Sequence, residues 1–353
     1  MEPRDLSSFA VYDVPSGEDG DRTDCLSLDL NQNPFGPSAE AVAAVREHAE
    51  GVHEYPKAVH ADLTSAIADR WDVADEQVWL TRSGTGALDY LVRAFLDPGD
   101  RVLHSRPGFS YTSTSARYHS GEPDTYELSK ADDFAQTSET VLDSYDGHRV
   151  VFVTTPHNPT GSELSLDGVR AVADRTDEET LVVVDEAYGE FTDAPSAVEL
   201  VQQRDDVAVV RTFSKAYGLA GLRLGYAITP EAWADAYARV NTPFAVTTLA
   251  CRAGIAALGD ESHLERTVDT VRWSREYLRR EVAAKTWPSG GNFVLADVGD
   301  AAAVTEVCRQ RGVAIRDCTG HGLPGCVRLS CGTREETRAA VETINEVLGA
   351  VET

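Results

Sequence analysis

A lysine, two hydroxyls and an arginine lie close together in the segment RTFSKAYGLAGLRLGY, which covers residues 211–226. The amine of Lys215 can condense with an aldehyde, and the hydroxyls of Thr212 and Ser214, with the guanidinium of Arg223, can bind a dianionic phosphate. Lysine is rare in this chain, since only four occur against 28 arginines. A solvated helical lysine is the alternative interpretation. The segment predicts a covalent site for a ligand with both an aldehyde and a phosphate.

Small residues at another strand end could bind the same phosphate. Ser83, Gly84, Thr85 and Gly86 follow the apolar run QVWLT and precede the helical pattern ALDYLVRAF. Backbone N–H groups at the start of a helix form a ready anion site. A simple turn before a helix is the alternative.

Three polar residues follow two further apolar runs. Asp185 closes the run LVVV, where burial of a carboxylate is costly unless a cation or donor meets it. Asn158 lies in the proline-fixed turn PHNPTG, and Tyr188 follows Asp185 by three residues. A ring nitrogen would be a partner for the carboxylate, and a ring oxygen could accept from the other two. A helix N-cap and a turn asparagine are the plainer interpretations.

These motifs together resemble the aspartate aminotransferase superfamily of pyridoxal 5'-phosphate enzymes, called fold type I. Within it, SKAYGLAGLRLGY, NPTG and DEAY are most similar to the histidinol-phosphate aminotransferases, and the resemblance runs from about Asn31 to Glu336. It implies that Lys215 binds the cofactor as a Schiff base and is catalytic. The loop from Ser83 to Gly86 departs from that subfamily, which more often has a small residue followed by an acidic one.

The resemblance also implies roles for residues outside these motifs. Phe109 matches an aromatic ring stacked on the cofactor, with a core phenylalanine as the alternative. Tyr55 matches a tyrosine that reaches the cofactor phosphate of the other subunit, which implies a homodimer. Asn33 lies in NQNPFGP, similar to a loop at the cleft, and is expected to bind substrate. Arg316 and Arg328 match the pair that binds the anionic groups of both substrates, whereas surface arginines are the alternative.

The implied reaction has two half-reactions with ping-pong kinetics. L-Histidinol phosphate and 2-oxoglutarate would give imidazole-acetol phosphate and L-glutamate, a step of histidine biosynthesis. A sister aminotransferase for aromatic or other amino acids, or a decarboxylase of a phosphorylated amino acid, stays open on the same fold. A non-catalytic regulator would need a DNA-binding domain, and a dinucleotide-binding dehydrogenase would need G-x-G-x-x-G after its first strand. Neither feature is present in the sequence.

Helical and strand patterns alternate through most of the chain, which indicates an α/β fold. Buried strands are expected at 181–184 and 207–210, followed from about residue 260 by a long amphipathic helix, a strand at 292–296, a helix at 301–311 and a strand at 326–330. The resemblance implies a mostly parallel seven-stranded sheet between helices and a smaller α+β domain. The expected division is an N-terminal arm (1–30), a large cofactor-binding domain (31–258) and a small C-terminal domain (259–353).

Composition limits the partners that the protein can have. The formal net charge is −26 and the pI is about 4.6, which disfavours nucleic acid and anionic membranes through repulsion. The acidic residues are spread along the chain and lysines are few, a composition that resembles that of proteins from salt-loving organisms. The six cysteines form no C-x-x-C pair, so we expect reduced thiols and no metal site. The start of the chain lacks a signal-peptide pattern, so a cytoplasmic location is expected.

Overall fold

The computed structural model describes Ser7, Phe9 and residues 25–57 and 60–351. The predicted N-terminal arm, residues 1–30, therefore lies mostly outside the described residues. Among the described helices, none combines the length and the apolar content needed to cross a bilayer.

The larger part of the molecule is built on a seven-stranded sheet. Its strands are, in spatial order, β2 (Val78–Thr81), β8 (Gly225–Ile228), β7 (Val207–Thr212), β6 (Leu181–Asp185), β5 (Val150–Thr154), β3 (Arg101–Arg106) and β4 (Glu122–Glu127). Among these strands β8 runs opposite to the others, since its pairings with β2 and β7 are antiparallel and the remaining pairings are parallel. Every residue of β5, β6 and β7 is buried, as their continuous β-branched runs require. The predicted mostly parallel sheet is confirmed.

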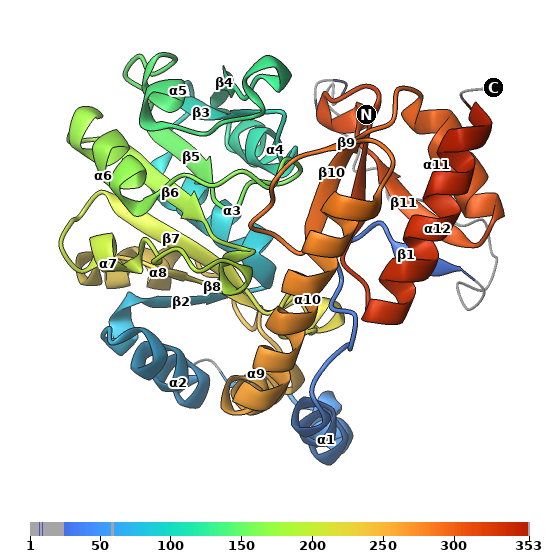
Figure 1. Cartoon of the computed structure of the whole chain (residues 1–353). Helices are drawn as coiled ribbons and strands as arrows, with labels where there is room; N and C mark the ends of the chain where they lie inside the picture. Colours follow the sequence, from blue (N-terminus) through green and yellow to red (C-terminus); the bar gives the residue numbers. More distant parts are fainter. Residues whose placement is uncertain (1–6, 8, 10–24, 58–59, 352–353) are drawn as a thin grey trace, which may run out of the picture.

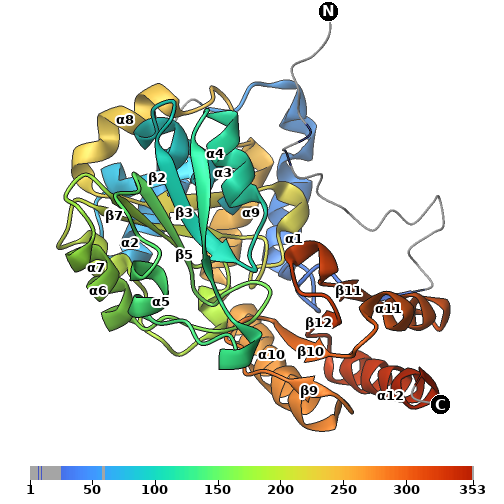
Figure 2. The same cartoon turned by 90° about the horizontal axis from the view of Figure 1, so that it is seen from above.

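Helices cover both faces of this sheet (Figure 2). One face packs against α3 (Ser83–Phe95), α4 (Tyr111–Tyr118) and α8 (Ala234–Val240). The other face packs against α2 (Ala61–Trp71), α5 (Ser138–Leu142), α6 (Leu166–Arg175), α7 (Val198–Val201) and α9 (Thr248–Gly259). In α6, Val169, Val172 and Ala173 recur at helical spacing and are all buried. The amphipathic pattern that predicts a helix thus also sets which side meets the sheet.

A second, five-stranded sheet forms the smaller part, on the right in Figure 1. Its order is β1 (Leu26–Leu28), β11 (Val313–Asp317), β12 (Cys326–Ser330), β10 (Phe293–Asp297) and β9 (Lys285–Thr286). The long α10 (Glu261–Glu281), α11 (Ala301–Gln310) and α12 (Arg334–Val351) pack on it in a separate apolar cluster. The strands expected at 292–296 and 326–330 and the helix at 301–311 form within one residue of their predicted ends. The domain boundary between residues 258 and 259 stays a prediction.

Strand β1 lies within the range predicted for an N-terminal arm, and that arm stays a prediction. It pairs in parallel with β11, with Leu26 opposite Val313 and Leu28 opposite Ile315, so residues 26–28 form an edge of the small sheet. In Figure 1 the blue β1 lies beside the red elements from the other end of the chain. A three-residue strand is too short to give a recognisable two-residue period, because only one alternation fits within it.

The remaining elements are α1 (Ala39–His48), which packs against α9, and short 3-10 helices in the connections. These are η2 (Ala49–His53), η3 (Asp75–Gln77), η4 (Lys130–Asp132), η5 (Gly189–Phe191), η6 (Ala220–Leu222), η7 (Glu231–Trp233) and η8 (Thr319–His321).

A loop from β1 to α1 meets the lysine segment at close range. Gly218 has φ of +68°, and a Cβ there would come within 2.2 Å of the Gly36 carbonyl oxygen. Only glycine meets both requirements without strain. This contact fixes the loop of residues 29–37 beside Lys215.

Candidate active site

A cavity of about 600 Å³ opens at the carboxyl ends of the central parallel strands. Thr154, Asp185 and Thr212 end β5, β6 and β7, and all three line it. This edge is where ligands bind in open α/β sheets. The cavity walls include most of the predicted site residues, namely Ser83, Gly84, Thr85, Phe109, Asn158, Asp185, Tyr188, Thr212, Ser214, Lys215, Arg223 and Arg328.

Lys215 lies in this cavity with its amine directed to the loop after β1. Its Nζ donates to the Leu30 carbonyl oxygen at 3.1 Å and lies 5.7 Å from the centre of the Tyr188 ring. Burial, together with the positive charges of Arg328 and Arg223, lowers the pKa of Lys215 from 10.5 to about 7. A substantial share of the amine is therefore neutral near pH 7, which makes it a nucleophile and a proton acceptor.

Asp185 is buried at the end of β6, and its side chain is 8% exposed. Burial raises its pKa to about 6, with a smaller contribution from the neighbouring charge of Glu186. Its Oδ1 accepts from the Ala187 backbone N–H at 3.0 Å, and that is the hydrogen bond recorded for it within the described chain. A cationic partner in the cavity would restore the ionised form.

The first turn of α3 forms one wall of the cavity and presents its backbone N–H groups there. Gly225, on β8, permits this approach, because a Cβ there would come within 2.4 Å of the Gly84 nitrogen. Ser83 has φ of +78°, which turns the chain sharply from β2 into the helix. The helix N-terminus carries partial positive charge, so this wall favours an anion.

Two side chains of the lysine segment face the same wall. Ser214 has a buried Oγ with no hydrogen-bond partner in the described part of the chain. Arg223 lines the cavity in a left-handed conformation, with φ of +55°, and donates to the Ala220 carbonyl oxygen at 2.9 Å. A buried hydroxyl without a partner costs free energy, so its position beside a helix N-terminus and an arginine fits a bound phosphate.

Arg328 connects the small sheet to the cavity. It is 5% exposed in β12, and it donates from Nη1 to Asn158 Oδ1 at 2.6 Å and from Nη2 to the Asp29 carbonyl oxygen at 2.8 Å. Its Nε is buried without a hydrogen-bond partner among the described residues. The guanidinium therefore keeps a free donor for an anionic ligand.

Four predicted site residues lie outside the cavity lining. Gly86 lies in the first turn of α3, and Arg316 lies opposite Arg328 in the pairing of β11 with β12. Asn33 donates to the Ala216 carbonyl oxygen at 2.7 Å, so it ties the loop to the lysine segment rather than facing the cavity. Tyr55 is 84% exposed in this single chain.

The structure adds contacts that the sequence does not single out. Asn31 lines the cavity, has φ of +54° and donates from Nδ2 to the Tyr188 hydroxyl at 3.0 Å. Tyr111, Thr114 and Tyr118 line it from one face of α4. Their spacing of three and four residues, which places side chains on one face of a helix, is the sequence pattern that could have indicated them. For Asn31 the corresponding pattern is the asparagine-rich loop NQNPFGP, in which the sequence analysis predicts Asn33 as the substrate-binding residue.

Phe9 also contacts a residue that lines the cavity. The ring of Phe9 stacks on Tyr118 with 5.0 Å between centroids and 26° between planes. Nothing in the sequence around Phe9 indicates this contact, because it joins positions far apart in the chain.

The fold and this set of residues define a class of enzyme. The family model for aminotransferases of class I and II matches residues 23–344, and the chain belongs to that family. A histidinol-phosphate aminotransferase of Haloarcula marismortui, a halophilic archaeon, is 60% identical over 99% of both chains.

Solved structures give the same architecture. One is a histidinol-phosphate aminotransferase of Sinorhizobium meliloti in complex with pyridoxal-5'-phosphate, with a TM-score of 0.84 and 28% identity over 92% of this chain and 91% of that one. A double mutant of Thermus thermophilus aspartate aminotransferase has a TM-score of 0.81 and 27% identity, covering 92% of each chain. The fold is therefore the fold type I architecture that the motifs imply.

Proposed function

We propose that this protein transfers the amino group of L-histidinol phosphate to 2-oxoglutarate, using pyridoxal 5'-phosphate. One observation carries the chemistry: a lysine with a lowered pKa, a buried carboxylate and anion donors without partners among the described residues meet in one cavity. The choice of substrate is supported by 60% identity, over nearly the whole chain, to a histidinol-phosphate aminotransferase. The aspartate aminotransferase neighbour has the same fold with a different named substrate, so the fold alone does not fix the substrate.

The residues present fit this cofactor. The phosphate would be held by the first turn of α3, Ser214 and Arg223, where the Ser214 hydroxyl has no partner among the described residues. Asp185 would hold the protonated ring nitrogen, and that contact favours its charged form over the neutral form that burial favours. Asn158 and Tyr188 are the donors for the ring oxygen.

In the reaction, Lys215 has two tasks. Its amine binds the cofactor covalently and, once released, moves a proton from the substrate Cα as general base and later returns one as general acid. When bound, the cofactor supplies an electron sink for the charge left at that carbon. Arg328, with its free Nε, binds the anionic group of each substrate in turn, and Arg316 supports it from the adjacent strand.

We also propose that the active enzyme is a homodimer. Tyr55 is 84% exposed and Phe244 is 51% exposed, and their rings lie 5.0 Å apart on the surface. Exposed aromatic pairs of this kind are typical of interfaces rather than of free surfaces. In the dimer, Tyr55 would reach the cofactor phosphate of the partner subunit.

An absorbance titration tests this function. The purified protein in concentrated salt, loaded with pyridoxal 5'-phosphate, should show a visible band that is lost when L-histidinol phosphate is added without a keto acid. Lys215→Ala should lack both the band and transamination. Phenylalanine and phosphothreonine are added in parallel titrations as alternative substrates. A band that responds to one of these and not to histidinol phosphate would overturn the substrate assignment, whereas absence of any band would overturn the cofactor.

A further inference from the structure

Two neighbouring strands place charged residues on the side of the sheet that faces away from the cavity. Asp185 and Thr212 line the large cavity, whereas the adjacent residues Glu186 and Arg211 line a separate cavity of about 180 Å³. This follows from the alternation of side chains along a strand. Asp185 and Thr212, which line the large cavity, are thus each next in sequence to a charged residue that lines the smaller cavity.

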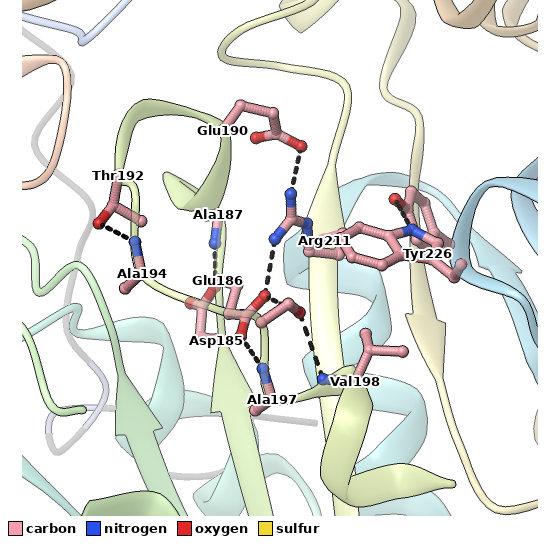
Figure 3. Close-up of polar contacts among 12 residues, drawn as sticks. Asp185, Glu186, Ala187, Glu190, Thr192, Ala194, Ala197, Val198, Arg211 and Tyr226 are labelled. Carbon is pink, nitrogen blue, oxygen red and sulfur yellow. Dashed lines mark hydrogen bonds and ion pairs between the residues drawn. The ribbon is translucent and has the colours of Figure 1, made fainter. Parts of the chain in front are cut away.

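Arg211 joins two carboxylates behind the strand ends (Figure 3). Its Nη1 donates to Glu186 Oε2 and its Nη2 donates to Glu190 Oε1, both at 2.6 Å, and all three side chains are 5% exposed. Glu186 also accepts from the Ser196 hydroxyl and from the Ala197 backbone N–H, each at 2.7 Å. Arg211 Nε and Glu190 Oε2 are buried without a hydrogen-bond partner among the described residues, so the two ion pairs are the contacts that offset the cost of burying these charges.

Two neighbours pack closely against the Arg211 guanidinium. A Cβ at Gly189 would come within 2.2 Å of Arg211 Nη1, so the turn between Glu186 and Glu190 lies directly against the guanidinium. The Trp71 ring centre lies 4.7 Å from the guanidinium carbon. These contacts restrict where the planar group can lie.

The two contacts anchor a short segment that contributes side chains to the large cavity. Asp185 and Tyr188 line the large cavity from this segment, 185–190, while Glu186 and Glu190 are its anchors. Within the described part of the chain, the Asp185 side chain is held by the hydrogen bond from the Ala187 N–H, so its position depends on the backbone. A shift of Glu186 or Glu190 would therefore also move the Asp185 carboxylate.

We propose that Arg211 is a positioning residue, which bridges Glu186 and Glu190 so that Asp185 and Tyr188 meet the cofactor ring. This inference rests on the proposed function, because it assigns the ring nitrogen to Asp185. The bridge requires a planar guanidinium, since one ammonium group cannot reproduce the two separate N–H contacts in a fixed fork.

The test compares Arg211→Lys with a matched control in cofactor binding to the apoprotein. Arg204→Lys is the control, because Arg204 also joins two carboxylates, Asp174 and Asp206, at the opposite end of β7. Quenching of tryptophan fluorescence by pyridoxal 5'-phosphate gives the dissociation constant. We expect it to rise about tenfold or more for Arg211→Lys, because small displacements of a positioned group are costly. Arg204→Lys should stay within about twofold of the unchanged protein, since it is remote from the cavity.

A second readout separates positioning from general destabilisation. When Asp185 is displaced, the ring nitrogen loses part of its anionic partner, so the pH midpoint of the visible band should shift in Arg211→Lys but not in Arg204→Lys. Should Arg211→Lys fail to fold, Glu190→Gln and Glu190→Ala replace it. The glutamine keeps an acceptor for Nη2 and should retain affinity, whereas the alanine should lose it.

The outcomes are distinct. Unchanged affinity and midpoint in Arg211→Lys, or in Glu190→Ala when that pair is used, would overturn the positioning role while leaving the proposed function intact. Equal losses in Arg211→Lys and Arg204→Lys would also overturn it. An unchanged protein that binds no cofactor would overturn the proposed function, and this inference with it.

Discussion

At the scale of single residues, Lys215 and Asp185 show the same burial effect with opposite sign. Burial lowers the pKa of the lysine to about 7 and raises the pKa of the carboxyl to about 6, so in each case the neutral form gains. Each shift reduces the stability of the apoprotein near pH 7. The burial that prepares these two groups for the cofactor thus lowers the free energy of unfolding of the apoprotein.

The lysine predicts a pH-dependent difference between Lys215→Met and the unchanged protein. The folded state binds fewer protons than the unfolded chain between pH 7 and 10.5, so the contribution of Lys215 to unfolding free energy rises with pH across this window. Without cofactor, Lys215→Met should be the more stable protein at pH 7, and its advantage should shrink toward pH 10.5. Urea unfolding at several pH values measures this, and an advantage independent of pH would contradict it.

For Asp185 the window lies at lower pH. The folded state binds more protons than the unfolded chain between pH 3.8 and about 6, so its contribution to stability falls as pH rises through that range. Asp185→Asn should therefore stabilise the apoprotein above pH 6 and not below pH 4. It should also weaken cofactor binding by about tenfold or more, from loss of an ionic partner. Denaturant unfolding and cofactor titration together check this, and wild-type affinity in Asp185→Asn would count against the assigned contact.

At the scale of elements, glycines let separate segments approach closely enough to form the cavity. Gly225 on β8 lies against the start of α3, and Gly218 lies against the loop that contains Gly36. The phosphate wall and the lysine loop each depend on one such contact. Both are positions where a methyl group would meet backbone atoms, which cannot rotate away.

Gly225→Ala should separate α3 from β8. Because the new Cβ would lie within 2.4 Å of the Gly84 nitrogen, we expect unfolding free energy to fall by about 1–3 kcal/mol. Affinity for the cofactor phosphate should fall as the helix start moves. Gly259→Ala is the control, since nothing lies within 4 Å of its Cβ. Thermal unfolding and phosphate competition measure the two effects, and equal behaviour of both variants would refute the role of this approach.

At the scale of the whole molecule, the two sheets and, by our proposal, two chains complete one site. Arg328 comes from the small sheet and contacts Asn158 of the large part, across 170 positions in sequence. The exposed Tyr55 lies beside Phe244, away from the cavity of its own chain. By the same proposal, Tyr55 contacts the site of the other copy.

Mixed dimers test this arrangement. Tyr55→Ala and Lys215→Ala should each have little activity alone, because one lacks the partner's contact and the other lacks the catalytic amine. Mixing them in equal amounts after dissociation should restore about a quarter of the wild-type activity, since half of randomly formed dimers then contain one intact site. An absence of recovery, with dimers confirmed by sedimentation, would place Tyr55 outside the partner's site.

The sequence predicted the strand-end residues well because their placement is local. A buried run such as that of β6 must end at a sheet edge. The position of Asp185 at the cavity can therefore be inferred without knowledge of the rest of the fold. The same reasoning places Thr212. It gives no strand at β1, whose three residues carry too little pattern, and it does not single out Asn31, which contacts Tyr188 from the same motif as Asn33.

The sequence by itself determined the reactive groups and their order along the chain, because Lys215, Asp185 and Asn158 lie in short motifs fixed by turns and strand ends. Only the tertiary structure decided how those groups behave. The pKa of Lys215 depends on burial and on Arg328 from the other sheet, and the bridge from Arg211 depends on pairing between strands. Desolvation and charge coupling are properties of the assembled interior, because they depend on distances between segments that the sequence leaves far apart.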